Sequence, residues 1–224
     1  MDTETTGLDP NGGDRIVEIG GVELVNHLPT GRTYHQYINP ERSMPREAFE
    51  IHGLGDDFLR DKPVFARVAD DFVNFIGDAT LVTHNASFDM AFLNAELSQA
   101  GHEKLPMTRA LDTLDIARRK FPGAQASLDA LCKRFGVDNS AREKHGALLD
   151  SEILAEVYLE LLGGRQRGLT LSADEGEKTQ AQSNATEWRA PPRAKALPPR
   201  ITEQEQSAHS AFIDEMGDAA LWRA

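Results

Sequence analysis

Apolar residues follow two spacings along the chain, and the first of these predicts strands. Residues 15–25 (RIVEIGGVELV) are rich in β-branched side chains, and after a turn-like stretch residues 32–38 (RTYHQYI) are again extended in character. Such a pair predicts a β-hairpin, which with the opening residues starts a three-stranded antiparallel sheet. The adjacent Gly20 and Gly21 predict a bulge or a close approach of another backbone segment. A short apolar run at 80–84 predicts a further strand.

The second spacing, of three and four residues, predicts helices. The clearest helix covers residues 63–76, has a proline at its start and a glycine after its end, and carries its apolar side chains on one face: Phe65, Val68, Phe72, Phe75 and Ile76. Further helical patterns lie at 45–52, 85–99, 127–135 and 144–162, and residues 105–121 contain a short extended piece and a helix. The pattern at 85–99 follows directly on the strand at 80–84. Strands and helices together predict an α/β fold.

The character of the chain changes after Gly163 and Gly164. Residues 172–200 are dominated by small, polar and proline residues, a composition typical of a disordered tether. Beyond them, Thr202 and Glu205 predict a capping box that opens a helix with Phe212 on its apolar stripe. We therefore expect four parts: a folded domain (1–165), a short peptide (166–171), the tether (172–200) and a C-terminal helical segment (201–224).

Composition narrows the classes of function. The chain has 224 residues, of which 40% are hydrophobic, and a net charge of −12. This charge argues against a protein that grips long nucleic acids through a basic surface, but an acidic active site that binds metal ions stays compatible with it. The single Cys132 excludes an internal disulfide. Because no apolar run approaches the roughly 18 residues of a membrane span, and no signal peptide precedes the first motif, we expect a cytoplasmic protein.

Four carboxylates stand at predicted strand ends or helix starts. Asp2 and Glu4 alternate in the opening strand, so their side chains point to one face and repel unless a cation lies between them. Asp150 falls on the apolar stripe of its helix, where an unpaired carboxylate is costly to bury. Asp89 lies in an otherwise apolar first helical turn, and taken alone it is interpreted as an exposed acid favoured by the helix dipole.

These acids, with His145 five residues before Asp150, predict metal-dependent hydrolysis of a phosphodiester. Carboxylate oxygens without cysteine favour Mg²⁺ or Mn²⁺. Two such ions about 4 Å apart can activate a water and stabilise the leaving oxygen, while a nearby imidazole takes the proton from that water. The alternative is that the acids are solvated surface groups that share no site.

Three motifs support the metal-site interpretation: DTETTG at 2–7, HNASFD at 84–89 and HGALLD at 145–150. They resemble the DEDDh family of 3′ to 5′ exonucleases, and the resemblance covers nearly the whole chain. It implies an RNase-H-like fold in which helices flank a five-stranded mixed sheet. It also implies that His145 is the general base, since Gly146 stands where a sister group has tyrosine, and that four residues bind the metal ions: Asp2, Glu4, Asp89 and Asp150.

The same resemblance implies a set of contacts with the terminal nucleotide. Three of the metal ligands, Asp2, Glu4 and Asp150, belong to this set, and the other members are Thr5, Glu47, His52, His84 and Asn85. For His52 and His84 the alternative is an ordinary structural histidine.

Two segments outside the predicted domain resemble docking peptides. Residues 166–171 (QRGLTL) are similar to the peptide by which polymerase-associated proteins bind the sliding clamp, with Gln166, Leu169 and Leu171 as anchors, although so short a pattern also arises by chance. By resemblance, the C-terminal segment binds the catalytic alpha subunit of a replicative polymerase, unless its helix packs back on the domain; its anchors are Phe212, Leu221 and Trp222. Family membership also allows a small theta-like subunit as a partner.

The resemblance implies proofreading, the removal of mispaired 3′-terminal nucleotides of DNA as 5′-monophosphates. The alternatives are a stand-alone member that trims RNA or repair intermediates, and a non-catalytic adaptor between clamp and polymerase. The sequence departs from the family at one place, where an apolar strand precedes the DTE motif in the family but Met1 alone precedes it here. We therefore expect a truncated first strand, and we interpret Met1 as an alternative start inside a longer reading frame.

Overall fold

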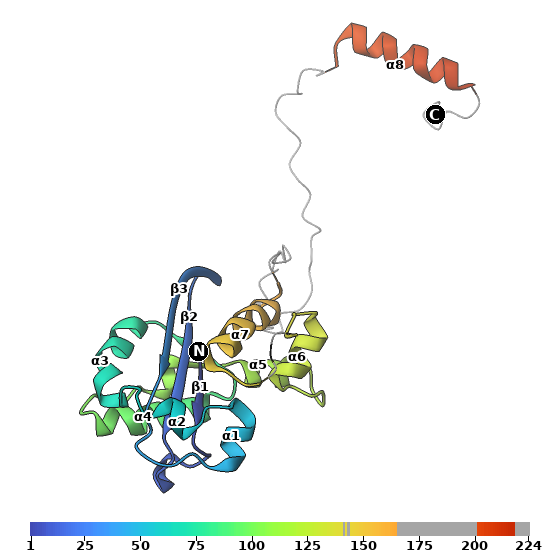
Figure 1. Cartoon of the computed structure of the whole chain (residues 1–224). Helices are drawn as coiled ribbons and strands as arrows, with labels where there is room; N and C mark the ends of the chain where they lie inside the picture. The colour runs from blue at the N-terminus through green and yellow to red at the C-terminus, as the bar shows by residue number, and fades with distance from the viewer. Residues whose placement is uncertain (141, 143, 165–200, 218–224) are drawn as a thin grey trace, which may run out of the picture. The chain divides into compact units, whose positions relative to one another are not determined.

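The computed structural model describes residues 1–140, 142, 144–164 and 201–217. The chain divides into two units, Met1–Leu171 and Ser172–Ala224, and each is described by itself. In the first unit three antiparallel strands form a sheet in the order β1 (Asp2–Thr5), β2 (Ile16–Val25) and β3 (Leu28–Tyr37) (Figure 1). The predicted hairpin is confirmed.

The hairpin turn is tighter than the sequence pattern suggests. Strand β3 begins at Leu28 rather than at Arg32, because the turn consists of Asn26 and His27 alone, with φ angles of 53° and 68°. Two consecutive positive φ values match the twist of the flanking strands in a two-residue hairpin. The stretch interpreted as a turn therefore belongs mostly to the ladder.

The remaining strands, β4 (Leu81–Thr83) and β5 (Ala110–Asp112), pair in parallel in a second sheet. The five predicted strands of mixed direction are thus present, but they form two sheets. The amino group of Met1 donates a hydrogen bond of 2.7 Å to the Val82 carbonyl, which links the beginning of β1 to β4. Burial lowers the pKa of this amino group below its ordinary value.

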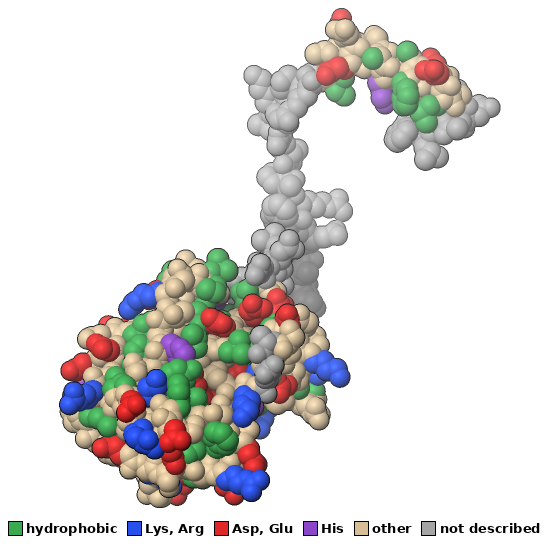
Figure 2. Space-filling view, in the orientation of Figure 1, with side chains coloured by type: hydrophobic (Ala, Val, Ile, Leu, Met, Phe, Trp, Pro, Cys, Tyr) green, Lys and Arg blue, Asp and Glu red, His purple; other side chains and the backbone are tan. Residues whose placement is uncertain are grey.

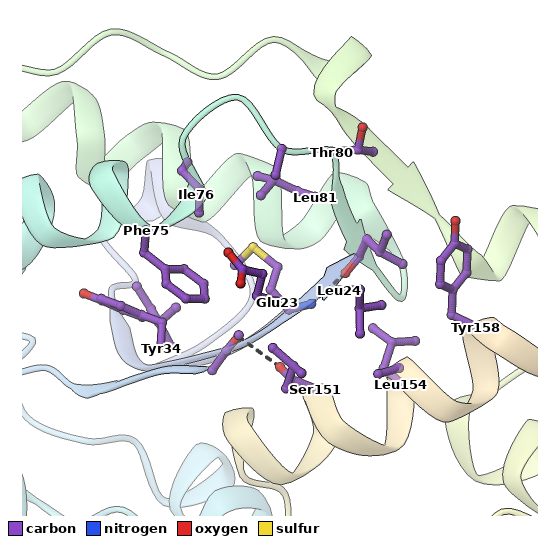
Figure 3. Close-up of a pocket in the computed structure, with 18 of the residues that line it drawn as sticks. Glu23, Leu24, Tyr34, Phe75, Ile76, Thr80, Leu81, Ser151, Leu154 and Tyr158 are labelled. Atoms are coloured by element: carbon purple, nitrogen blue, oxygen red, sulfur yellow. Dashed lines mark hydrogen bonds between the residues drawn. The ribbon is translucent and has the colours of Figure 1, made fainter. Parts of the chain in front are cut away.

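An apolar cavity of about 470 Å³ separates β4 from the part of β2 that β1 does not cover. Strand β1 pairs with β2 only as far as Gly20, so the edge of β2 beyond Gly20 borders this cavity. Figure 3 shows side chains from three sides of it: Phe75 and Ile76, Leu81 of β4, and Leu154 and Tyr158.

Helices surround the strands, and their bounds follow the predicted patterns to within a few residues: α1 (Arg46–His52), α3 (Phe65–Ile76), α4 (Ala86–Gln99), α5 (Thr113–Lys120), α6 (Leu128–Phe135) and α7 (Ala147–Leu161) (Figure 1). Helix α2 (Asp56–Leu59) and the 3-10 turns η1 (Pro10–Gly12) and η2 (Met107–Arg109) were not predicted, because three or four residues are too few to show a periodicity. The core has two buried clusters, one between the sheets, α3 and α4, and one between α5, α6 and α7.

Gly20 allows β2 and α7 to touch. A Cβ atom at this position would lie 2.1 Å from the backbone carbonyl carbon of Ala147, which is far closer than real side chains come. The Ser151 hydroxyl donates a hydrogen bond of 2.9 Å to the Gly20 carbonyl and fixes the contact. The predicted close approach is confirmed, and it places the first turn of α7, with Asp150, against the sheet.

In the second unit, α8 (Glu203–Met216) has the predicted capping box, in which Thr202 and Glu205 bond each other's backbone N–H groups. Phe212 is 59% exposed. The other predicted docking residues, Gln166, Leu169, Leu171, Leu221 and Trp222, and the tether at 172–200 lie outside the described residues. Among the helices that the structure describes, none is both long and apolar enough to cross a membrane.

Candidate active site

A cavity of about 550 Å³ collects most of the residues that the motifs point to. Strand β1 and the turn after it form one wall, α1 another, and the start of α4 a third. The predicted site residues that line it are Asp2, Glu4, Thr5, Glu47, His52, His84, Asp89 and His145. On the face shown in Figure 2, acidic and basic side chains are interspersed around the domain, with no continuous basic surface.

Among the described residues no basic side chain forms a hydrogen bond or ion pair with the β1 carboxylates, of which Glu4 is buried and Asp2 half-buried. Glu4 is 8% exposed, and its Oε1 has no hydrogen-bond partner among the described residues. Burial raises the pKa of Glu4 from 4.5 to about 8. Burial, followed by the charges of Asp89, Glu4 and Asp150, raises the pKa of Asp2 well above its ordinary value. A bound cation would lower both pKa values, because it favours the charged form of a carboxylate.

Asp89 lies in the first turn of α4 and is 2% exposed, so its interpretation as a solvated acid is wrong. The helix starts directly after β4, and its first turn therefore packs against β1 rather than facing water. The Thr3 hydroxyl donates a hydrogen bond of 2.8 Å to Asp89 Oδ1. Burial raises the pKa of Asp89 to about 6, although this hydrogen bond opposes the rise.

Asp150, in the first turn of α7, is equally buried but has basic partners. The Arg142 Nη2 donates to Asp150 Oδ2 at 2.8 Å, and Arg142 Nε lies 2.5 Å from Oδ1. His145 Nδ1 is 3.4 Å from Oδ2. Burial raises the pKa of Asp150, but the hydrogen bonds from His145 and Arg142 outweigh it and hold the pKa below its ordinary value. The hydrogen bond to Asp150 in turn raises the pKa of His145.

The donor atoms fit a divalent cation. Possible ligand atoms of Glu4, His145 and Asp150 all lie within 4.8 Å of one another. Asp2 and Asp89 do not belong to this group of three. The carboxylate of Asp89 is nevertheless close enough to Asp2 for its charge to raise the pKa of Asp2. The oxygen ligands that Asp2, Glu4, Asp89 and Asp150 offer suit a hard ion such as Mg²⁺ or Mn²⁺. The raised pKa values and the unpartnered Glu4 oxygen show a site whose negative charge is only partly compensated.

Two predicted substrate-contacting histidines lie in the cavity wall. His52, in α1, accepts a hydrogen bond from the Leu54 N–H at 3.0 Å, while its Nε2 is buried without a partner among the described residues. His84 Nδ1 lies 2.9 Å from the Thr113 hydroxyl. Burial lowers the pKa of both rings, so near neutral pH both favour the uncharged form.

Asn85 does not line the same cavity as His52 and His84. It stands before α4 with a φ of 74°, and it lines a neighbouring cavity with Asp112 rather than the one that contains the carboxylates. Its backbone N–H donates to the Asp112 carboxylate at 3.0 Å. The structure therefore separates Asn85 from the other predicted substrate contacts.

Comparison with known proteins shows the family to which the chain belongs. The RNase_T exonuclease model matches residues 1–158. DNA polymerase III subunit epsilon of Rickettsia typhi is 50% identical over 219 residues, covering 96% of this chain and 95% of the relative. The Escherichia coli protein of the same name is 46% identical over 238 residues, covering 100% and 96%. The chain belongs to the DNA polymerase III epsilon family of exonucleases.

Solved structures agree on the fold of this epsilon-family enzyme. The nuclease domain of 3′hExo, a DEDDh family member bound to rAMP, has a TM-score of 0.63 at 23% identity, covering 74% of this chain and 92% of that one. Exonuclease X with 5′ overhanging duplex DNA has a TM-score of 0.56 at 26% identity, covering 72% and 88%. The predicted RNase-H-like DEDDh fold, and a 3′ to 5′ exonuclease activity that uses divalent metal ions, are confirmed.

Two residues of the epsilon-family site were missed from the sequence. Thr3 lies between the two acids but has no side chain typical of a metal ligand, and Arg142 is a single basic residue in a polar loop, which forms no pattern. The position of Thr3 inside the DTETTG motif was an available signal. For Arg142 only the three-dimensional contacts with Asp150 and His145 show its role.

Proposed function

We propose that this epsilon-family exonuclease is the proofreading subunit of a DNA polymerase III, which removes mispaired 3′-terminal nucleotides as 5′-monophosphates. The observation that carries the proposal is the convergence of Glu4, His145 and Asp150, whose ligand atoms lie within 4.8 Å of one another, while Glu4 and His145 also line the cavity. Relatives named for the same subunit, at 45–50% identity over nearly the whole chain, support the polymerase context.

We assign two Mg²⁺ or Mn²⁺ ions to four carboxylates: Asp2, Glu4, Asp89 and Asp150. When bound, such ions supply Lewis-acid activation of a water and stabilise charge on the phosphate. The chain's own base is His145, which is half exposed at the cavity and hydrogen-bonded through Nδ1. It takes the proton of the attacking water, a role that requires the neutral ring.

The cavity also explains a preference for unpaired ends. Glu47 and His52 come from α1 and His84 follows β4, so they meet the terminal nucleotide from two sides. The unpartnered Nε2 of His52 is suited to a hydrogen bond with the substrate. A cavity of about 550 Å³ has room for a single nucleotide and not for a duplex, so a frayed 3′ end enters more readily than a paired one.

The remaining parts of the proposal concern partners. We assign residues 1–165 to the nuclease domain, the peptide with Gln166, Leu169 and Leu171 to the sliding clamp, and residues 201–224 to the polymerase alpha subunit, with 172–200 as the tether between them. Phe212, exposed on α8, supports the last of these because a large apolar side chain on a helix face suits helix docking. A theta-like subunit and a cytoplasmic location complete the assignment.

Degradation of a labelled single strand from its 3′ end, in the presence of Mg²⁺ or Mn²⁺, tests the nuclease. We expect His145→Ala to lower kcat about 10²–10⁴-fold, the usual contribution of a general base. His102→Ala is the matched control, since His102 lies beside Asp70 and does not line the cavity. An inactive full chain that still binds polymerase and clamp would favour the adaptor, and a preference for RNA would favour the stand-alone enzyme.

A further inference from the structure

The segment that leads to His145 is tied to α6 by one carboxylate. Asp129 Oδ1 accepts a hydrogen bond of 2.6 Å from Arg142 Nη1 and one of 3.1 Å from Asn139 Nδ2. Asp129 lies in the first turn of α6, and its side chain is 62% exposed. The Arg142 side chain, in contrast, is only 8% exposed, so its guanidinium is enclosed although the carboxylate that holds it faces solvent.

The other edge of the same guanidinium contacts the active site. Arg142 Nη2 donates to Asp150 Oδ2 at 2.8 Å and lies 2.8 Å from His145 Nδ1. One planar group thus connects α6 with a metal ligand and with the general base. Lysine has no comparable shape, because its ammonium is a point donor while the guanidinium is a rigid fork.

His145 needs such a restraint. Its side chain is 49% exposed, so packing alone does not hold the ring, and its backbone N–H donates a hydrogen bond of 3.3 Å to the Ile51 carbonyl of α1. Asp150 has a fixed backbone in α7, but its carboxylate must also be oriented toward Glu4. Two contacts from one guanidinium, the hydrogen bond from Nη2 to Oδ2 and the close approach of Nε to Oδ1, restrain the orientation of this carboxylate more than one contact would.

We propose that Arg142, anchored by Asp129, is a positioning residue that orients Asp150 and His145 for hydrolysis. The proposal rests on the proposed function, because it assigns these two residues their roles in the exonuclease. A purely structural ion pair is the competing explanation. The exposure of Asp129 separates the two, because an ion pair with one solvent-exposed partner contributes little to folding stability, whereas loss of orientation lowers catalysis.

The test uses the full chain with four variants: Arg142→Gln, Arg142→Lys, Asp129→Asn and the Asp129→Asn/Arg142→Gln double variant. We expect Arg142→Gln to lower kcat about 10–100-fold with KM changed less than about threefold, as misplacement of reacting groups does. Arg142→Lys should restore little of this, and Asp129→Asn should lose about 3–10-fold. The double variant should be no worse than Arg142→Gln, because the two act in series.

Arg134→Gln is the matched control, since Arg134 also belongs to α6 but stacks over Phe121 and touches no site residue. A readout without metal or substrate is the NMR spectrum of the histidine rings, with His145 assigned by its loss in His145→Ala. We expect one sharp set of His145 signals in the parent and in Arg134→Gln, and broadened signals in Arg142→Gln and Asp129→Asn.

Additive losses in the double variant, a full rescue by lysine, or unchanged His145 signals would overturn the positioning role. A fall in melting temperature that accounts for the lost activity would do the same. If the parent chain shows no nuclease activity, the proposed function fails, while the ring signals still decide whether Arg142 holds His145.

Discussion

The carboxylates on the two sides of the acidic site differ in whether a basic side chain lies beside them. Asp150, on α7, has Arg142 and His145 within hydrogen-bonding distance, and its pKa is held below the ordinary value. Asp2 and Glu4, on β1, have no ion pair with a basic side chain among the described residues, and their pKa values are raised. The α7 side thus has its counter-charge in the fold, whereas on the β1 side we assign the counter-charge to the proposed metal ions.

This difference indicates that metal binding would stabilise the fold mainly through the β1 carboxylates. Carboxylates that are buried together without a counter-charge destabilise the folded protein, and a metal ion that neutralises them stabilises it. The β1 side should therefore govern how stability depends on pH and metal, while the α7 side should govern the geometry of the reaction. Four changes to the chain or its conditions test this division.

The largest effect is expected for Glu4→Gln, which should reduce exonuclease activity on the order of 10³-fold, since it removes several kcal/mol of charge stabilisation. The folding stability of Glu4→Gln should, in contrast, be higher than that of the parent at high pH. Because the pKa of Glu4 is raised to about 8, its contribution to stability is full below 4.5 and is lost as the pH rises through 8. Calorimetry with chelator should show a higher melting temperature than the parent at pH 9 and little difference near pH 4.

Glu18→Gln is the control for that substitution. Glu18 faces Glu4 across the β1–β2 register and is also buried, but it has His35 at 2.7 Å. We expect no gain in stability from its neutralisation. An equal gain would contradict the explanation, because burial of any glutamate would then suffice.

Gly20→Ala should displace Asp150, on the α7 side of the site. The new methyl group would overlap the backbone of Ala147 and push the first turn of α7, with Asp150, away from β2. Overpacking of this kind costs about 1–3 kcal/mol, and activity should fall beyond what the loss of folded protein explains. Denaturant unfolding and activity per folded molecule measure both effects.

Gly21→Ala is the control, because it adds the same methyl group at the next position, where the methyl group meets different neighbours. Its Cβ would lie 3.2 Å from the ring of Phe75, which borders the apolar cavity and has room to shift. We expect a smaller loss of stability and unchanged activity per folded molecule. Equal damage from both substitutions would mean that the β2–α7 contact has no special role.

Metal binding should stabilise the protein more at pH 8 than at pH 5. The pKa of Asp89 is raised to about 6 and that of Glu4 to about 8, so at pH 5 protons occupy both carboxylates and compete with the ion. Melting temperatures with and without Mg²⁺, and calorimetry in buffers of different ionisation enthalpy, should show proton release on binding. A metal-induced shift that is the same at both pH values would refute the prediction.

The smallest effect is expected for Thr3→Val, which removes the hydrogen bond to Asp89 and leaves the shape of the side chain. A net hydrogen bond of about 1 kcal/mol corresponds to about fivefold weaker Mn²⁺ binding. Thr30→Val, which removes an exposed hydroxyl bonded to Glu23 in the hairpin, should leave the affinity unchanged. Titration calorimetry compares the two.

Local patterns in the sequence predict the longer helices and strands and identify the acids and the histidine of the site, but not Thr3 or Arg142. Apolar periodicity predicted α3 and α7 nearly to their ends, because both bury one continuous face in the core. The three motifs identified the acids and His145, because metal chemistry requires particular atoms at strand ends and helix starts. The close approach at Gly20 was predictable for a similar reason, since only glycine permits it.

The environment of each acid was decided by the tertiary structure alone. Asp89 reads as an exposed first-turn acid until α4 is placed against β1, and Asp150 reads as an unpaired buried charge until Arg142 is brought to it from the preceding loop. Ionisation depends on desolvation and on charges nearby in space, which are properties of packing between distant segments. The sequence determined the acids and the histidine of this site, and the fold determined which of these acids have a basic side chain beside them.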